Sequence, residues 1–429
     1  MAWIRKFVLG ILKPELKNAV LILCVLNAAG SLFMVLLAGQ RFSSGIRLLF
    51  RQEVNLANHF LVNCPKGQEG YFDMAKLQFS FKFLSGIVAQ FLGDEEAVSI
   101  ERYGKGSIND SFKVVTAVRS YLLQRVNSEY FPEPLKLLSN FRKIASCQKS
   151  LPGLTAFELK DGSGLWYRDD SGAYWRLYNF FEHSYGCQKI DNVYQAYEIA
   201  KAYGQYLAAL SELPIGSLDV VVVGFHDTVR RYRQLLMAAE RDEFRRVSDC
   251  RQEIDFVKSR LEEMVNFSWL VDGESLPRRL THNDTGIDNV LLDKNTGAAL
   301  AVIDWDTTMP GFSLWDFGDL FRSALGTEFN DPVPVTQCFN ALLNGYLAGA
   351  GHLLLPEEVL NFAKAGRIIS LELGIRYLTD FLSGDIVFKY DDGISLLRAR
   401  KSLLRYKMMA HHQAELDKIA DSALSACSR

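Results

Sequence analysis

The sequence predicts an α+β fold of two lobes, a small amino-terminal lobe rich in strands and a larger, mostly helical carboxy-terminal lobe. Short apolar runs separated by polar turns lie between Val98 and Phe181, as in a meander of strands. From Val193 onward, apolar residues recur at helical spacing in long segments. We therefore expect residues 76–182 to form the small lobe and residues 183–429 to form the large one.

The small lobe is predicted to begin with a helix and three strands. Apolar residues at helical spacing predict a helix over 77–91, which Gly93 ends. Strand composition follows over 98–103, 112–115 and 121–126. Two further strands, over 156–160 and 172–181, would complete the meander.

The chain then passes into the large lobe. Phe180 to His183 is interpreted as the hinge between the lobes. The periodic segments that predict helices after it cover 193–213, 225–239, 253–270, 335–350, 356–384 and 394–423. His226 and Arg230 stand at i, i+4 in one of them, and we expect both to be structural.

One stretch between these helices carries the chemistry. His282, Asp284 and Asn289 form the pattern H-x-D-x-x-x-x-N, in which a kinase-type loop supplies a base aspartate and a metal-binding asparagine. Two apolar runs over 290–303, joined by a tight turn, predict a hairpin that returns the chain to Asn289. Asp304 would then share an ion with Asn289. Phosphoryl transfer needs such hard oxygen ligands to hold Mg²⁺ on the phosphates of ATP.

A second candidate for the metal ligand lies downstream, where Asp316-Phe-Gly318 spells a familiar kinase triplet. It follows Asp284 by 32 positions, whereas Asp304 follows by 20 positions and ends the hairpin. We therefore assign the metal to Asp304. Asp316 precedes an apolar run and is expected to cap a helix or brace the catalytic loop.

A glycine-containing turn precedes the second strand of the small lobe. Gly104, Lys105, Gly106 and Ser107 stand where a loop could cover the ATP phosphates, because glycines let backbone N–H groups approach them. A simple hairpin turn is the alternative, and only the presence of the catalytic loop favours a phosphate-covering loop.

The next strand departs from the kinase pattern. Where kinases carry a lysine for the phosphates, this chain has Gln124 or Arg125. The helix after Pro134 has Ser139 where a glutamate is expected. A lysine–glutamate ion pair cannot be assumed, so ATP is either held differently or turned over slowly.

One late helix combines charges with apolar residues. Glu372, Arg376 and Asp380 recur at i, i+4, i+8 on one face. Buried charges need partners, so this face meets solvent, pairs internally as a salt-bridge row, or binds a polar ligand.

Residues 1–75 precede the lobes as an extension. Asn18 to Gln40 is a run of 23 residues without a charge, and a helix of that length covers roughly 34 Å, about a bilayer core. It is a candidate membrane anchor, a helix packed on the small lobe, or an upstream extension that is not native. Met74 is an alternative start.

Composition and charge indicate the cellular compartment of the protein and exclude some classes of partner. The net charge is -2, and no long basic run with interleaved aromatics indicates nucleic-acid binding. Seven scattered cysteines without a C-x-x-C pair indicate reduced thiols rather than disulfides or zinc. We expect a cytoplasmic protein, with residues 18–40 as its candidate anchor.

The loop, the Ile303-Asp-Trp-Asp306 strand end and the Asp316-Phe-Gly-Asp319 segment resemble the aminoglycoside phosphotransferase and choline kinase superfamily. Within it the chain is most similar to N-acetylhexosamine 1-kinases, through segments that begin at Tyr103, Leu123, Tyr174, Gly224 and Leu371. The resemblance covers residues from about 85 to about 407. It implies a protein-kinase-like fold, ATP and Mg²⁺ as cofactors, and a helical insert beside the acceptor pocket.

Two functions of different classes follow. The leading one is a kinase for the anomeric hydroxyl of an N-acetylhexosamine, with choline, homoserine, methylthioribose and aminoglycosides as other acceptors. Asp284 would activate the hydroxyl, His282 would brace the loop, and Asp306 and Arg376 would contact the sugar, with the metal as a second possibility for Asp306. The rival is a catalytically weak, ATP-binding interaction protein of the same fold.

Overall fold

The computed structural model describes residues 20–26, 32–38, 79–104, 108–147, 154–273, 275–327, 331–388 and 394–427. The chain divides into two compact units, Met1–Gln78 and Phe79–Arg429. The first unit contains strands β1 (Val20–Leu26) and β2 (Leu32–Ala38), which pair antiparallel.

The helix predicted over 18–40 is therefore wrong for the residues that the structure describes. Val, Ile and Leu side chains fit a strand as well as a helix, so an uncharged run does not by itself decide between them. Among the described residues, no helix combines the length and the apolar character needed to cross a membrane.

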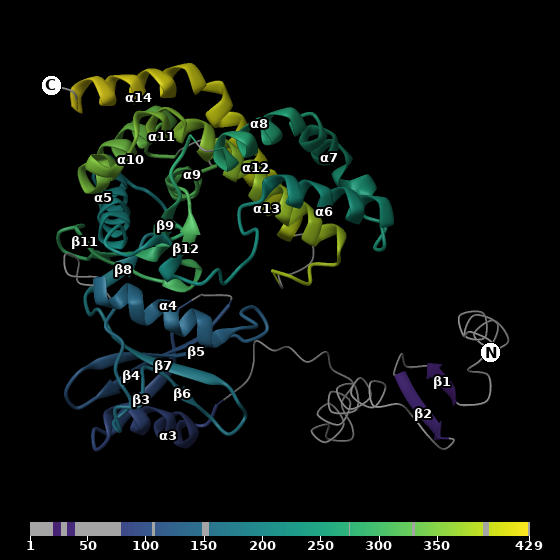
Figure 1. The fold of residues 1–429 in the computed structure, drawn as a ribbon, viewed down its shortest axis with the longest axis vertical. Helices are drawn as coiled ribbons and strands as arrows, with labels where there is room; N and C mark the ends of the chain where they lie inside the picture. The colour runs from purple at the N-terminus through teal and green to yellow at the C-terminus, as the bar shows by residue number, and fades with distance from the viewer. Residues whose placement is uncertain are drawn as a thin grey trace. The chain divides into compact units, whose positions relative to one another are not determined.

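The small lobe of the second unit is a five-stranded antiparallel sheet with a helix on each face (Figure 1). Its strands lie in the order β3-β4-β5-β7-β6. Their bounds are β3 (Ala97–Arg102), β4 (Asp110–Thr116), β5 (Ser120–Arg125), β6 (Tyr167–Arg168) and β7 (Tyr174–Asn179). Helix α3 (Phe81–Leu92) covers one face, and helix α4 (Pro134–Cys147) lies between the other face and the large lobe.

The core of the small lobe forms between α3 and the sheet. Ser80 caps α3 by accepting a hydrogen bond from Phe83 N, and the left-handed Gly93 ends the helix as predicted. One face of α3 packs against the alternate, inward-facing residues of the strands. The main residues of this core are Leu84, Ile87, Val88, Phe91, Val114, Leu123, Trp175 and Leu177.

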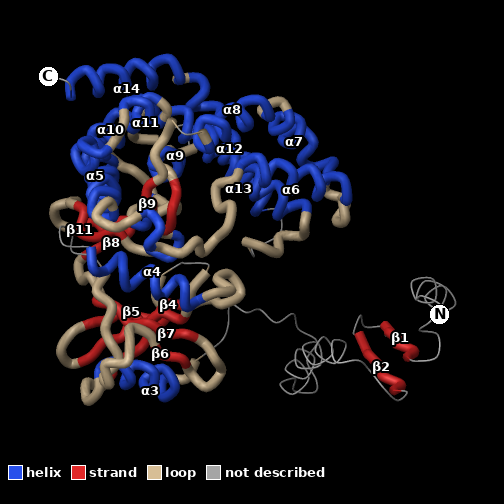
Figure 2. The backbone as a smooth tube through the Cα atoms, in the orientation of Figure 1, coloured by secondary structure: helices blue, strands red, loops and turns tan. Residues whose placement is uncertain are grey.

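The large lobe is helical around a three-stranded sheet and a pair of short strands, which carry the catalytic loop (Figure 2). Its strands are β8 (Ser184–Gly186), β9 (Arg279–Thr281), β10 (Val290–Asp293), β11 (Ala299–Val302) and β12 (Met309–Gly311). Its helices are α5 (Val193–Leu210), α6 (Thr228–Arg241), α7 (Arg251–Lys258), α8 (Leu261–Asp272), α9 (Ser313–Ala324), α10 (Val335–Ala350), α11 (Pro356–Leu360), α12 (Phe362–Leu382), α13 (Ile394–His411) and α14 (Gln413–Cys427). The predicted hinge falls where β7 ends and β8 joins β10.

Helices α5 and α10 pack closely enough for their backbones to touch. A Cβ atom added to Gly345 would lie 2.2 Å from Tyr197 O, and one added to Gly204 would lie 2.4 Å from Tyr346 O. Only glycine fits at these two positions. The pair therefore forms a dense support beneath the loop that follows β9.

The boundaries differ from the sequence prediction in a few places. The helices predicted over 253–270, 356–384 and 394–423 are each divided in two, with breaks near Ser259, Asn361 and His412. None of these positions carries the glycine or proline that signals a break. The strand predicted over 156–160 is an isolated bridge between Ala156 and Tyr178.

Candidate active site

The catalytic loop runs from β9 into the β10–β11 hairpin. The register pairs Val290 with Val302, and Ile303 N donates to Asn289 O at 2.9 Å, so the two ends of the hairpin meet. Asp304 lies two residues after the end of β11 and has a positive φ of 60°, a conformation that aspartate tolerates better than most residues. The hairpin thus brings Asn289 and Asp304 to the same end, as the spacing predicts.

The Asp316 carboxylate binds the backbone of the catalytic loop. Its carboxylate accepts hydrogen bonds from His282 N at 3.0 Å and from Asn283 N at 2.7 Å, and the side chain is 2% exposed. Burial raises the pKa of this carboxyl to about 7, although the two N–H donors act in the opposite direction. Asp316 lies in the first turn of α9 and braces the loop, so its predicted structural role is confirmed.

His282 links the loop to the hairpin. Its Nε2 lies 2.9 Å from Ile303 O, and the rings of Tyr203 and Tyr206 stand edge-on to the imidazole. Burial lowers the pKa of His282 to about 4, so the ring is neutral near pH 7. A neutral ring that donates from Nε2 leaves Nδ1 to accept from Asp284 N, which lies 3.3 Å away. His282 thereby orients the backbone of Asp284.

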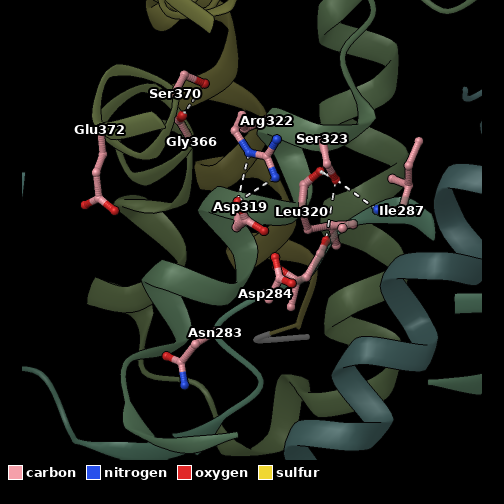
Figure 3. A network of polar contacts seen from close by, with 12 residues as sticks. Asn283, Asp284, Ile287, Asp319, Leu320, Arg322, Ser323, Gly366, Ser370 and Glu372 are labelled. Carbon is pink, nitrogen blue, oxygen red and sulfur yellow. Dashed lines mark hydrogen bonds and ion pairs between the residues drawn. The ribbon is translucent and has the colours of Figure 1, made fainter. Parts of the chain in front are cut away.

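The Asp284 carboxylate is half-buried and accepts no hydrogen bond from the described part of the chain. Figure 3 shows Asp319 between it and Arg322, with Arg322 paired to Asp319 at 2.7 Å. Burial, followed by the charge of Asp319, raises the pKa of Asp284 to about 6, while Arg322 and Arg376 oppose the rise. The group is ionised at neutral pH and close to the pKa that suits a base.

Asn289 and Asp304 present the oxygen atoms that a metal ion needs. Asn289 donates its amide N–H to Asp284 O at 2.9 Å, so its Oδ1 stays available. Asp304 is open at its surface, yet the surrounding protein and the charges of Asp306 and Asp284 raise its pKa to about 8. Crowded carboxylates of this kind are stabilised by a cation.

The donor set fits a magnesium ion that is completed by a nucleotide. Within the described residues, no group of three or more histidine, cysteine, aspartate and glutamate side chains could hold a metal alone. Mg²⁺ is usually bound by one or two protein ligands together with phosphate oxygens and water. Asn289 and Asp304 match that pattern.

The predicted nucleotide residues are only partly brought together. Gly104 has a φ of 83°, which only glycine adopts freely, and Lys105, Gly106 and Ser107 lie outside the described residues. Arg125 pairs with Asp110 at 3.3 Å on the open side of the lobe. Its predicted phosphate contact stays a prediction, and in this structure its partner is Asp110.

Gln124 has a different partner from the one expected. Its Oε1 accepts from Arg176 Nε at 2.9 Å, and its Nε2 donates to Ser111. Arg176 is 2% exposed and pairs with Asp306 at 2.7 Å. Asn109 also donates to Asp306, at 2.7 Å. Asp306, which was predicted to contact metal or sugar, is thus bound through both oxygens by residues of the small lobe.

The polar face of α12 is not the salt-bridge row that was one alternative. Glu372 accepts from Thr228 at 2.7 Å and lies 3.2 Å from His226 Nδ1, while Asp380 accepts from Ser395 at 3.0 Å. Both carboxylates are buried. His226 also meets Asn283 O at 2.8 Å through Nε2, so its predicted structural role is confirmed.

Arg376 remains without a hydrogen-bond partner among the described residues. Its guanidinium is half-buried, 5.5 Å from the ring centre of Phe225 and 5.7 Å from that of Phe388. The two rings hold it by cation–π contact while its N–H groups stay available. Its charge also acts on Asp284, where it opposes the rise in the pKa of that carboxyl.

Sequence reasoning missed Arg176, Asp319 and Arg322. The only signal for Arg176 was its place in a strand of aromatic residues, which says nothing of an ionic partner 130 positions away. Asp319 and Arg322 stand at i, i+3, a common helical pair. Their closeness to Asp284 depends on how α9 packs against the loop.

Comparisons with known proteins agree with this geometry. A family model described as "Phosphotransferase enzyme family" matches residues 99–352, more than half of the chain. The fold is similar to an aminoglycoside phosphotransferase from Alicyclobacillus acidocaldarius, at 14% identity and a TM-score of 0.54 over 83% of this chain and 98% of that one. A microcompartment-associated aminopropanol kinase matches at 14% identity and a TM-score of 0.53, over 79% and 99% of the two chains. An amicoumacin kinase in complex with AMP-PNP and Ca²⁺ matches at 12% identity and a TM-score of 0.53, over 80% and 96%. At such identities the similarity shows the fold alone.

Proposed function

The chain belongs to the phosphotransferase enzyme family, and on this premise we propose that it is an ATP- and Mg²⁺-dependent kinase that phosphorylates a hydroxyl of a small molecule. The observation that carries the proposal is the open carboxylate of Asp284 beside the oxygen donors Asn289 and Asp304. Its specific form is a kinase for the anomeric hydroxyl of an N-acetylhexosamine, which the sequence resemblance supports.

The residues divide the work of phosphoryl transfer. Asp284 accepts a hydrogen bond from the acceptor hydroxyl and takes its proton as the new O–P bond forms. The bond between the γ-phosphorus of ATP and the bridging oxygen breaks at the same time, and ADP leaves with that oxygen. Its pKa of about 6 keeps it ionised and still basic enough for this step. Mg²⁺, bound by Asn289 and Asp304, would neutralise charge on the phosphates. His282 and Asp316 keep the loop rigid, so that little reorganisation is needed.

The charges on the acceptor side favour one class of acceptor. The charges of Arg376 and Arg231 repel each other. Burial, followed by the charge of Arg376, lowers the pKa of Arg231. These two guanidinium groups would repel the cationic group of choline or an aminoglycoside placed beside them, whereas the carboxylates of Asp284 and Asp319 would attract it. A neutral sugar with an acetamido carbonyl offers acceptors for the fork of Arg376 instead. This supports the N-acetylhexosamine and disfavours the cationic alternatives.

The second candidate, a catalytically weak ATP-binding protein, is motivated by helix α4. Ser139 leaves α4 without the expected glutamate. The helix is nevertheless docked on the large lobe, because Asn140 exchanges two hydrogen bonds of 2.8 Å with the backbone of Asp219. A docked α4 favours the kinase over the weak binder.

The test is metal-dependent ATP turnover with a panel of acceptors. N-acetylglucosamine and glucosamine form a matched pair, because they differ in the acetyl group that removes the positive charge. We expect turnover with the acetylated sugar that requires Mg²⁺, and much slower turnover with the amine. The Asp284→Asn variant serves as the inactive control.

Each outcome decides between the alternatives. Turnover of the amine at the same rate would refute the role of the arginines. Turnover of homoserine or methylthioribose alone would redirect the substrate assignment. Nucleotide binding without turnover of any acceptor would favour the weak binder.

A further inference from the structure

One buried carboxylate of the large lobe, Asp306, is bound by several residues of the small lobe. It stands two residues after Asp304, in the turn Trp305–Thr307 that ends the catalytic hairpin. Arg176 on β7 contacts both of its oxygens at 2.7 Å, through Nη1 and Nη2. The two side chains are 3% and 4% exposed, so this is a desolvated pair in which each charge depends on the other.

Further groups of the small lobe complete the arrangement. Gln124 is the direct cross-strand neighbour of Arg176 in the β5–β7 register and fixes its guanidinium from the other side. Asn109 lies where the glycine turn joins β4, and it donates to the same Asp306 oxygen as Arg176 does. Asn127 N in turn donates to Asn109 Oδ1 at 2.9 Å. Asn109 and Arg176 thus bind the same residue of the large lobe, and Gln124 holds Arg176 in place.

An aromatic contact also joins the two lobes close to the ion pair. Trp305, between Asp304 and Asp306, stacks on Phe141 of α4 with ring centres 5.2 Å apart. The Arg176 guanidinium lies 6.0 Å from the centre of the same Phe141 ring. The turn that carries Asp304 is therefore fixed by the sheet on one side and by α4 on the other.

We propose that Arg176, Gln124, Asn109 and Asp306 form an interlobe latch that positions Asp304 for the metal–nucleotide complex. In kinases an ion pair between a strand lysine and a helix glutamate aligns the small lobe. This chain has Gln124 or Arg125 and Ser139 in those places, and its buried ion pair joins Arg176 on β7 to Asp306 of the large lobe. Arg176 and Asp306 are positioning residues in this scheme. The proposal rests on the proposed function, because it concerns the binding of that nucleotide.

The electrostatics are consistent with the latch. Burial alone would lower the pKa of Arg176, but the charge and hydrogen bond of Asp306, together with Tyr178 and Asp304, raise it overall. Arg176 also opposes the rise in the pKa of Asp304. The arginine therefore acts on the metal carboxylate as well as on its own partner.

The experiment measures nucleotide binding and local exchange in the full chain. Arg176→Met removes the latch cation and keeps much of its volume, while Arg176→Lys keeps the charge but not the planar fork. Arg168→Met is the matched control, because Arg168 is exposed on the adjacent strand β6. Calorimetry with AMP-PNP, with and without Mg²⁺, gives the affinities, and hydrogen exchange follows residues 304–308 and 108–111.

We expect Arg176→Met to weaken Mg²⁺-dependent AMP-PNP binding by about ten- to a hundredfold, the effect of losing a charged hydrogen bond in a buried site. Metal-free binding should change much less, and exchange over 304–308 should speed up. Arg176→Lys should recover part of the affinity, whereas Arg168→Met should behave as the wild type.

A second route covers the case in which Arg176→Met does not fold. The neutral double variant Arg176→Met/Asp306→Asn removes both charges together and leaves no buried charge unpaired. It should fold and should show the same loss of metal-dependent affinity. The loss in the double variant should be smaller than the sum of the two single losses, as for residues in contact.

Two results would overturn the latch. One is unchanged metal-dependent affinity and exchange in the double variant. The other is an equal loss of affinity with and without Mg²⁺, which a purely structural role would give. A wild type that binds no nucleotide would instead refute the proposed function, and the latch would then be judged by the exchange of 304–308 alone.

Discussion

The sharpest prediction concerns Asp316, the carboxylate beneath the catalytic loop. Asp316→Ala removes the acceptor of two backbone N–H groups, on His282 and Asn283. Both donors would stay buried without a partner, and each such group costs roughly 1–3 kcal/mol. The unfolding free energy should fall by about 2–6 kcal/mol. A fall of at least about 2 °C in the melting temperature follows, because the unfolding entropy of a chain of this length is roughly 0.9 kcal/mol/K.

The assay is thermal and denaturant unfolding at about pH 8, above the pKa of about 7 that burial gives this carboxyl. Asp293→Ala is the matched control, because Asp293 also accepts from two backbone N–H groups, those of Asn295 and Thr296, but at an exposed turn where water can replace it. Its loss should be much smaller.

Nucleotide binding by Asp316→Ala and by Asp304→Ala decides between the two candidate metal carboxylates. Asp304→Ala should abolish Mg²⁺-dependent nucleotide binding, while Asp316→Ala should largely keep it. The reasoning is refuted if Asp316→Ala melts like the wild type, or if it loses Mg²⁺-dependent binding more completely than Asp304→Ala does.

Four further predictions follow from the site and the fold. Asp284→Asn should lower turnover by at least roughly a hundredfold, the lower end of what a base supplies, with little change in calorimetric ATP affinity; near-normal turnover would contradict the assignment. Arg376→Ala should raise the acceptor KM about ten- to a hundredfold through the loss of a charged hydrogen bond, and an unchanged KM in steady-state kinetics would place Arg376 outside the pocket. A chain starting at Met74 should fold and keep its activity, because the compact second unit begins at Phe79; insoluble protein would show that the first unit is needed. The His226–Glu372 pair should stabilise the fold most between about pH 4.3 and 6.5, the ordinary pKa values of the two groups. Burial alone would lower the pKa of His226 and raise that of Glu372, but their attraction reverses both shifts. The stability is then lost as pH rises through the raised pKa of His226 or falls through the lowered pKa of Glu372. Denaturant unfolding of Glu372→Gln against the wild type across pH checks this, and a difference independent of pH would count against a charged pair.

Local patterns were enough to predict the catalytic hairpin. The turn at Gly297 and the apolar runs around it fix which residues pair, and pairing carries Asp304 back to Asn289. The bracing role of Asp316 was predictable as well, since a carboxylate at the start of a helix is suited to binding backbone N–H groups. These inferences need only short-range rules.

The partners of Arg176 and Asp306 could not be predicted in that way. They are 130 positions apart and belong to different lobes, so no local spacing connects them. A carboxylate such as Asp306 is a suitable ligand for a metal or a substrate, and only the docking of the lobes shows that it pairs with Arg176. The uncharged run over 18–40 failed for a different reason, because apolar content alone does not select a helix over a strand.

The close packing of α5 and α10 has a consequence for sites far from the chemistry. Tyr203 on α5 donates its hydroxyl to Gly286 O at 2.7 Å, and Tyr206 on the same helix meets Thr308 at 2.8 Å. A methyl group added at Gly204 or Gly345 would separate the two helices and shift both tyrosines. Substitutions at these glycines would thus displace residues of the reacting centre through the rigid helices. Variants that lose activity only at raised temperature are expected at these positions.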